Sequence, residues 1–175
     1  QYVDTGMGLE RLCMALQKKN STYETDLFSD IIKEIENISN KKYLAGDEKV
    51  DIGIRVISDH LRAIVFTIID GQIPSNTGPG YVIRRILRRA IRYGYTNLDI
   101  QRPFIHELVD IMEDKYSSLY PNIITQKDFI KSIINDEEEG FLKTLNQGLN
   151  LINELIDSEP NDKLIKGDDA FKLYD

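Results

Sequence analysis

The feature that most constrains the fold is a segment of nine residues, 84–92, that contains five arginines. At about 100° per residue of an α-helix, these arginines fall within about 140° of the helix circumference. Aliphatic side chains occupy the rest of the circle: Ile83, Ile86, Leu87, Ala90 and Ile91. The spacing therefore predicts an amphipathic helix that packs its aliphatic face on a core and points its arginine face outward.

This arginine face calls for an anionic partner, because the chain as a whole is acidic, with 29 acidic residues, 22 basic residues and a net charge of -7. The planar fork of arginine suits phosphate oxygens, so the pattern favours binding to a nucleic-acid backbone. An alternative stays open, in which the chain's own carboxylates neutralise the face. The arginines expected to contact nucleic acid are Arg84, Arg85, Arg88 and Arg92.

Apolar residues recur at helical spacing along most of the chain, which predicts a mainly α-helical fold. The long C-terminal helix is expected to start at Thr125, in a sequence that resembles a capping box. It is expected to carry a coiled-coil-like seam that packs on another helix of the same domain and consists of Leu142, Leu145, Leu149, Ile152 and Ile156. The acidic run at 136–139 is interpreted as a solvated turn. Helices are expected at residues 9–19, 26–38, 51–70, 80–94, 103–115 and 125–158.

Composition excludes several classes of protein. A single cysteine, Cys13, rules out an internal disulfide and fits the cytoplasm, and two separated histidines with one cysteine cannot form a common structural zinc site. No run of roughly 18 uncharged apolar residues is present, so no membrane span is expected. The chain begins at Gln1 and ends at Asp175 inside an amphipathic pattern, so it is expected to be a piece of a longer protein.

The N-terminal segment predicts a short strand at residues 1–5, then two glycines and a helix. Gly6 and Gly8 would allow a ligand to approach the backbone closely, and Arg11 could hold a phosphate. Cys13 lies on the apolar stripe of the helix, so we expect it in the core rather than as a nucleophile. Asp59 and His60 point about 100° apart on a helix, which favours a structural hydrogen bond for His60 over acid–base chemistry.

Five segments in order are similar to the alanyl-tRNA synthetase family of class II aminoacyl-tRNA synthetases. The first, Asp4-Thr5-Gly6-Met7-Gly8-Leu9-Glu10-Arg11, resembles the third signature motif of class II, and the others are residues 55–62, 70–76, 80–90 and 170–175. The resemblance covers the whole chain. It implies a strand-glycine-helix remnant of the catalytic domain at residues 1–20, followed by a helical bundle-like tRNA-recognition domain, truncated at its C-terminus, at residues 21–175.

The resemblance also implies an activity for the whole enzyme, which uses ATP and Mg²⁺ to form alanyl-adenylate and transfers alanine to tRNA(Ala). Arg11, Gly8 and Glu10 would bind ATP, and Asp4 and Gly6 would bind alanine. The zinc of this family belongs to a separate editing region that this chain lacks. The first two class II motifs would precede Gln1, so the chain alone is expected to be inactive.

For tRNA, the resemblance implies that Asn76 and Asp175 read the G·U wobble pair in the acceptor stem of alanine tRNA. The minor groove of RNA is wide and shallow, and the wobble pair leaves the guanine 2-amino group as a donor there. A carboxylate can accept from this group, and an amide can both donate and accept. The arginine face would hold the phosphates without reading sequence.

Two other hypotheses compete with the ligase. One is a stand-alone helical RNA-binding or scaffolding domain without catalysis. The other is an internally neutralised helical bundle with no nucleic-acid role. The oligomeric state stays open.

Overall fold

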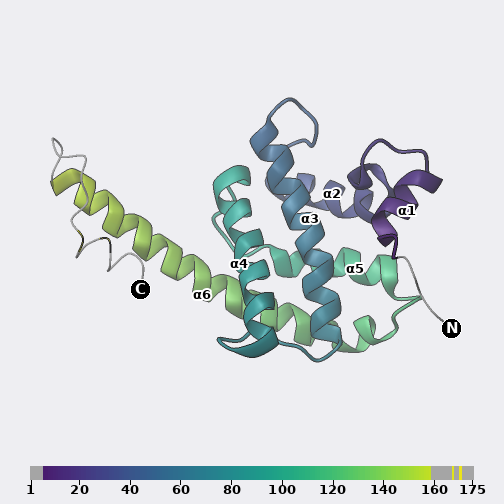
Figure 1. Ribbon diagram of the computed structural model, residues 1–175. Coiled ribbons are helices and arrows are strands. Elements are labelled where there is room, and N and C mark those ends of the chain that lie inside the picture. The colour runs from purple at the N-terminus through teal and green to yellow at the C-terminus, as the bar shows by residue number, and fades with distance from the viewer. Residues whose placement is uncertain (1–5, 159–166, 168–169, 171–175) are drawn as a thin grey trace.

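The computed structural model describes residues 6–158 together with Gly167 and Ala170, and it is mainly α-helical, as predicted (Figure 1). No β-strand occurs among these residues, and the predicted strand at residues 1–5 lies outside them. The described elements, in order, are α1 (Leu9–Leu16), the 3₁₀ turn η1 (Thr22–Glu24), α2 (Asp26–Ser39), α3 (Glu48–Ile69), α4 (Gly78–Leu98), the 3₁₀ turn η2 (Ile105–Leu108), α5 (Val109–Tyr116) and α6 (Asn122–Ser158).

Helix α3 lies at the centre of the fold and buries the apolar face that its spacing predicts. It forms its most extensive packing with α4, where Gly53 allows close approach because a Cβ atom there would lie 3.0 Å from Asn97 Cβ. Helices α2 and α5 and the first half of α6 complete one hydrophobic core. The buried residues of α3 include Ile54, Ile57, Leu61, Ile64, Val65 and Ile68.

The observed ends of α3, α4 and α6 differ from the predicted ends, because local capping contacts and backbone conformations set them. Helix α3 starts at Glu48, because the Asp47 carboxylate accepts from the backbone N–H groups of Lys49 and Val50. Helix α4 continues past Gly94 to Leu98 and stops where Asp99 adopts a left-handed conformation (φ 59°). Helix α6 starts at Asn122, so the predicted capping box at Thr125 is wrong. The Thr125 hydroxyl instead donates to the Asn122 carbonyl within the first turn.

The acidic run at residues 136–139 lies inside α6, within the helix predicted for residues 125–158, but the prediction that the run is solvated is wrong for Glu138. Glu138 is fully buried, and its carboxylate accepts hydrogen bonds of 3.0, 3.0 and 3.2 Å from the backbone N–H groups of Phe104, Ile105 and His106. These are free N–H groups at the start of η2, so Glu138 caps that turn from another helix. Burial raises the pKa of Glu138, and the N–H donors oppose this rise.

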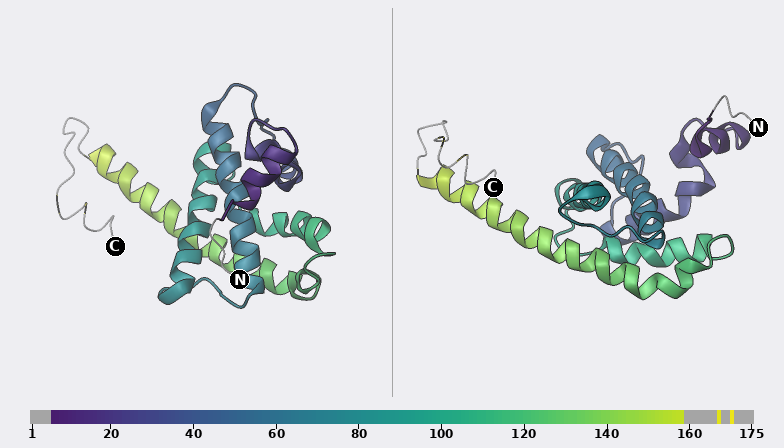
Figure 2. Two further views of the ribbon diagram at one scale, coloured as in Figure 1. Left: turned by 45° about the vertical axis from the view of Figure 1, so that its right-hand side comes forward. Right: turned by 60° about the horizontal axis from the view of Figure 1, so that its bottom comes forward.

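Helix α6 passes beneath α4 and then projects beyond the body of the domain (Figures 1 and 2). Its seam packs on the core only at the start, where Leu142 is buried and Leu145 is partly buried. Further along, Ile156 is 58% exposed. The expected packing of the whole seam on another helix is therefore wrong for the described part of the chain.

Helix α1 does not join the core. None of its residues is buried, and Leu9, Leu12 and Leu16 are exposed, so the expected core position of Cys13 is wrong. Among the described residues, α1 packs mainly on η1 and is tied to α3 by the ion pair of Glu10 with Arg62 (2.9 Å). The amphipathic spacing of this segment correctly predicts a helix, but no element among the described residues covers the apolar face of α1.

Candidate nucleic-acid interface

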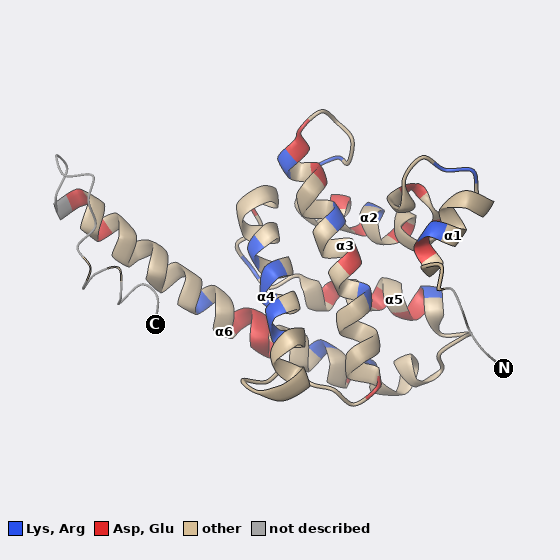
Figure 3. Ribbon diagram, viewed as in Figure 1, with Lys and Arg blue, Asp and Glu red and all other residues tan. Residues whose placement is uncertain are grey.

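The arginine face predicted from the sequence lies on α4, between α3 and α6. Pro79 stands in the first turn of α4, where its missing N–H costs no helical hydrogen bond. The opposite face of the helix is buried through Ile83, Leu87, Ala90 and Ile91. The ribbon in Figure 3 is coloured by residue type and shows basic residues along α4 and acidic residues on α6 where the two helices cross. The predicted division of this helix into an aliphatic and a basic face is therefore confirmed.

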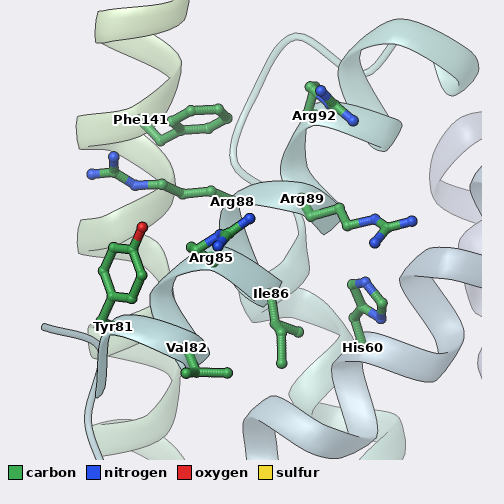
Figure 4. A pocket seen from close by; sticks show the side chains of 9 residues that line it. All are labelled: His60, Tyr81, Val82, Arg85, Ile86, Arg88, Arg89, Arg92 and Phe141. Atoms are coloured by element: carbon green, nitrogen blue, oxygen red, sulfur yellow. The ribbon is translucent and has the colours of Figure 1, made fainter. Parts of the chain in front are cut away.

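A groove of about 560 Å³ opens over this basic face (Figure 4). Figure 4 shows that Arg88 extends toward α6 and Phe141, whereas Arg89 extends the other way, toward His60 of α3. Three helices therefore supply the walls, and four guanidinium groups line them. The lining residues are His60, Tyr81, Val82, Arg85, Ile86, Arg88, Arg89, Arg92 and Phe141.

The arginines of α4 fall into two groups with different partners. Arg84 and Arg88 both donate from Nε to the same oxygen of Glu137, Oε1, at 2.8 and 2.5 Å. Internal neutralisation by the chain's own carboxylates therefore holds for these two arginines. Arg88 also lies over the ring of Phe141, with its guanidinium carbon 5.4 Å from the ring centre.

The second group has no carboxylate partner among the described residues. Arg85 lies 5.8 Å from the ring centre of Tyr81, and Arg89 and Arg92 lie 5.8 and 5.6 Å from that of Tyr93. All three side chains are exposed. Stacking on aromatic rings holds the planes of these guanidinium groups while leaving their N–H donors available. Within the described part of the chain, internal neutralisation therefore does not extend to these three arginines.

Asn76 lies on the exposed loop that leads into α4, next to the first group. Its Oδ1 atom accepts a hydrogen bond from Nη1 of Arg84. The loop turns back on the first turn of the helix, because Ser75 N–H donates to the Gly80 carbonyl and Ser75 Oγ donates to the Thr77 carbonyl. The structure thus brings Asn76 together with the arginine face. Asp175, its predicted companion, lies outside the described residues.

The predicted ATP and alanine residues lie on the other side of α3, at the start of α1. Gly6, Gly8 and Arg11 are exposed, and Gly8 is the residue immediately before α1. The carboxylate of Glu10 is already engaged, because it forms an ion pair with Arg62. A backbone hydrogen bond and this pairing hold the pKa of Glu10 below its usual value. Asp4 lies outside the described residues.

His60 makes the structural hydrogen bond predicted for it. Its Nδ1 lies 3.3 Å from Asp59 Oδ2, and this contact holds the pKa of Asp59 below its usual value. The other ring nitrogen, Nε2, is buried and has no hydrogen-bond partner among the described residues. The imidazole ring of His60 lines the groove on the α3 side.

Several residues of the groove are outside the set predicted to contact nucleic acid. Arg89 belongs to the arginine face by spacing, and its neighbours on that face already indicated it. Tyr81 lies one turn before Arg85, a spacing that favours contact on a helix surface. Phe141, which lines the groove, and Glu137, which binds Arg84 and Arg88 next to it, come from α6, about fifty residues further along the chain, and no local pattern could place them here.

In the described part of the chain, no group of three or more His, Cys, Asp or Glu side chains could hold a metal ion. None of the helices in that part is both long and apolar enough to cross a membrane.

Comparison with known proteins places the whole chain in one family. A family model described as tRNA synthetases class II (A) matches residues 1–175. An alanine–tRNA ligase from Staphylococcus epidermidis is 52% identical over 99% of this chain, and those from Christiangramia forsetii and Flavobacterium psychrophilum are 50% and 49% identical over 100% of it. Each match covers 20% of the relative, so the chain spans about a fifth of the length of these relatives. This chain belongs to the class II (A) tRNA synthetase family.

Proposed function

We propose that residues 21–175 bind the acceptor stem of tRNA(Ala) as the helical recognition domain of a cytoplasmic alanine–tRNA ligase, and that residues 1–20 end its class II catalytic domain. The observation that carries this proposal is a set of three exposed arginines that line the groove on α4 and have no carboxylate partner among the described residues: Arg85, Arg89 and Arg92. On a chain of net charge -7, such a set favours a polyanionic ligand. The names of the relatives support tRNA as that ligand.

In this proposal the arginines and Asn76 have separate tasks. The guanidinium groups of Arg85, Arg89 and Arg92 hold backbone phosphates, which fixes the position of the stem but carries no sequence information. Asn76 faces the minor groove and contacts the G·U pair, and Asp175 completes the contact. The position of Asn76, on an exposed loop next to the basic face, supports this division.

For the whole ligase we propose ATP-dependent attachment of alanine to tRNA, with Mg²⁺ assisting at the ATP phosphates. Gly8 and Arg11 are placed where a nucleotide could reach them, because the only atom near a Cβ position on Gly8 belongs to the flexible Glu10 side chain and Arg11 is exposed. ATP supplies the activated phosphate that makes the alanine carboxylate reactive. Arg11 would hold a phosphate, Gly8 and Glu10 would lie beside the nucleotide, Asp4 would hold the alanine ammonium, and Gly6 would line the alanine pocket.

Replacing Arg89 with alanine should weaken binding of an acceptor-stem RNA hairpin roughly five- to tenfold, because one charge-assisted phosphate contact is lost. The plot of log affinity against log salt concentration has a negative slope, and the magnitude of this slope should decrease by about 1. Fluorescence anisotropy of labelled hairpin, titrated at several salt concentrations, measures both quantities. Arg85→Ala should behave alike, since it belongs to the same unpaired group.

Arg102→Ala is the matched control for this experiment. It removes the same charge, but Arg102 pairs with Glu107 and lines a separate pocket at the end of α4, outside the groove. We expect its affinity and salt slope to stay within twofold of the parent chain. Equal losses in Arg89→Ala and Arg102→Ala would mean that the RNA responds to overall charge and not to this groove.

The chain by itself should not catalyse alanine-dependent exchange between ATP and pyrophosphate. Helix α1 has no buried residue, so nothing described here encloses Arg11 and excludes water as adenylate formation requires. Exchange is measured with labelled pyrophosphate, using Arg11→Ala as the control for contaminating enzyme. Exchange that depends on alanine and disappears in Arg11→Ala would overturn this expectation.

A further inference from the structure

We propose that Glu137 of α6 is a positioning residue for RNA recognition, which acts on Asn76 through Arg84. The inference rests on the proposed acceptor-stem function and adds to it a residue that contacts no RNA itself. The proposal depends on one connected chain of side-chain contacts. This chain runs from α6 through α4 to the loop that precedes α4.

The first link is the contact of Glu137 with two arginines. Its Oε1 atom accepts from Nε of Arg84 at 2.8 Å and from Nε of Arg88 at 2.5 Å, and its side chain is only 14% exposed. A carboxylate that binds a guanidinium through Nε leaves terminal nitrogens for other acceptors. Glu137 therefore fixes the direction of both arginines without using all of their donors.

The second link runs from Arg84 to Asn76. Because arginine has donors but no acceptor, the atom of Asn76 that meets Arg84 Nη1 must be the amide oxygen, Oδ1. The amide nitrogen then faces away from Arg84 and presents its two hydrogens as donors. Without Arg84, the amide of this exposed side chain could rotate and present either end. The contact thus selects one orientation of the predicted reading group before RNA binds.

The negative charge of Glu137 argues against a role that only strengthens phosphate binding. A carboxylate among phosphate-binding arginines repels the phosphates and lowers general affinity. It also joins α6 to α4, which a purely structural residue would do as well. The two roles differ in one observable: only a positioning residue should change the ratio of affinities for two stems that differ at a single base pair.

The experiment compares Glu137→Ala with Asp136→Ala on hairpins that carry a G·U or a G·C pair at the recognised position. Asp136 is the matched control, because it precedes Glu137 on α6, is exposed and accepts no hydrogen bond from these arginines. Both variants remove one negative charge, so both should bind both hairpins somewhat more tightly at low salt. Only Glu137→Ala should lower the G·U to G·C affinity ratio, by roughly fivefold.

Glu137→Gln, which keeps one acceptor oxygen, should retain part of the ratio. Asn76→Ala should abolish the ratio, and adding Glu137→Ala to it should have no further effect on the ratio. An unchanged ratio in Glu137→Ala, with a normal ratio in the parent chain, would overturn the positioning role and leave the proposed function intact. A parent chain that does not distinguish the two hairpins would instead overturn the proposed reading of the stem.

Discussion

Replacing Glu138 with alanine should lower the free energy of unfolding by about 3–6 kcal/mol, which is a large share of the stability of a domain this size. The carboxylate satisfies the backbone N–H groups of Phe104, Ile105 and His106, and it also lies 3.2 Å from the His106 ring nitrogen Nδ1. Two of these N–H groups are buried, so their loss of a partner costs about 1–3 kcal/mol each. The cavity left by the side chain adds to that loss. Urea unfolding followed by circular dichroism measures the change.

Two variants accompany this measurement. Glu138→Gln keeps one oxygen for Phe104 and Ile105 but turns its amide N–H₂ toward the N–H of His106, so it should lose about half as much stability. Glu139→Ala, in the same turn of α6, removes an exposed carboxylate whose contact is with Asn135, and it should stay within about 0.5 kcal/mol of the parent. If Glu138→Ala were as mild as Glu139→Ala, the capping role of Glu138 would be wrong.

Replacing Gly94 with alanine should lower the free energy of unfolding by about 1–3 kcal/mol, although alanine is the better helix former by about 1 kcal/mol. A Cβ atom at this position would lie 2.5 and 2.6 Å from two ring carbons of Phe104. Phe104 is 1% exposed, so its ring cannot move aside without disturbing the core. Thermal and urea unfolding of the two proteins measure the difference.

Gly140→Ala is the control that separates packing from helix propensity. Gly140 also lies within a helix, but a Cβ there would have no atom within 4 Å. The free energy of unfolding of this variant should therefore rise by about 0.5–1 kcal/mol. Stabilisation by both substitutions would show that the Gly94 contact is loose enough for the ring to adjust.

Much of the fold could be predicted because helical periodicity is a local property. Apolar spacing alone predicted α2 and α3, and the structure buries their apolar residues, such as Phe28 and Ile57. The errors lie where local rules compete with distant partners. The 3₁₀ turn at Ile105 is capped by Glu138, more than thirty residues away, and no pattern near Pro103 indicates that. The acidic run resembled a solvated segment because charged residues are buried only when distant groups compensate them.

The candidate site was partly predictable for the same reason. The arginine face follows from spacing within one helix, and the stretch from Gly6 to Arg11 is identified by its resemblance to a known motif. Glu137 and Phe141 belong to the site only because α6 crosses α4. Arg89 was on the predicted face, but the resemblance to known synthetases did not single it out.

The sequence by itself determined that this chain is helical, that one of its helices has an arginine face, and that it belongs to its family. These properties depend on neighbours within a few residues or on the order of motifs along the chain. Only the tertiary structure decided which arginines of α4 are neutralised by Glu137 and which have no carboxylate partner among the described residues. The arginines of α4 are alike in sequence, but Glu137 reaches Arg84 and Arg88 and lies on the wrong side of the helix for Arg85, Arg89 and Arg92. The charge available to a ligand therefore depends on where α6 crosses α4.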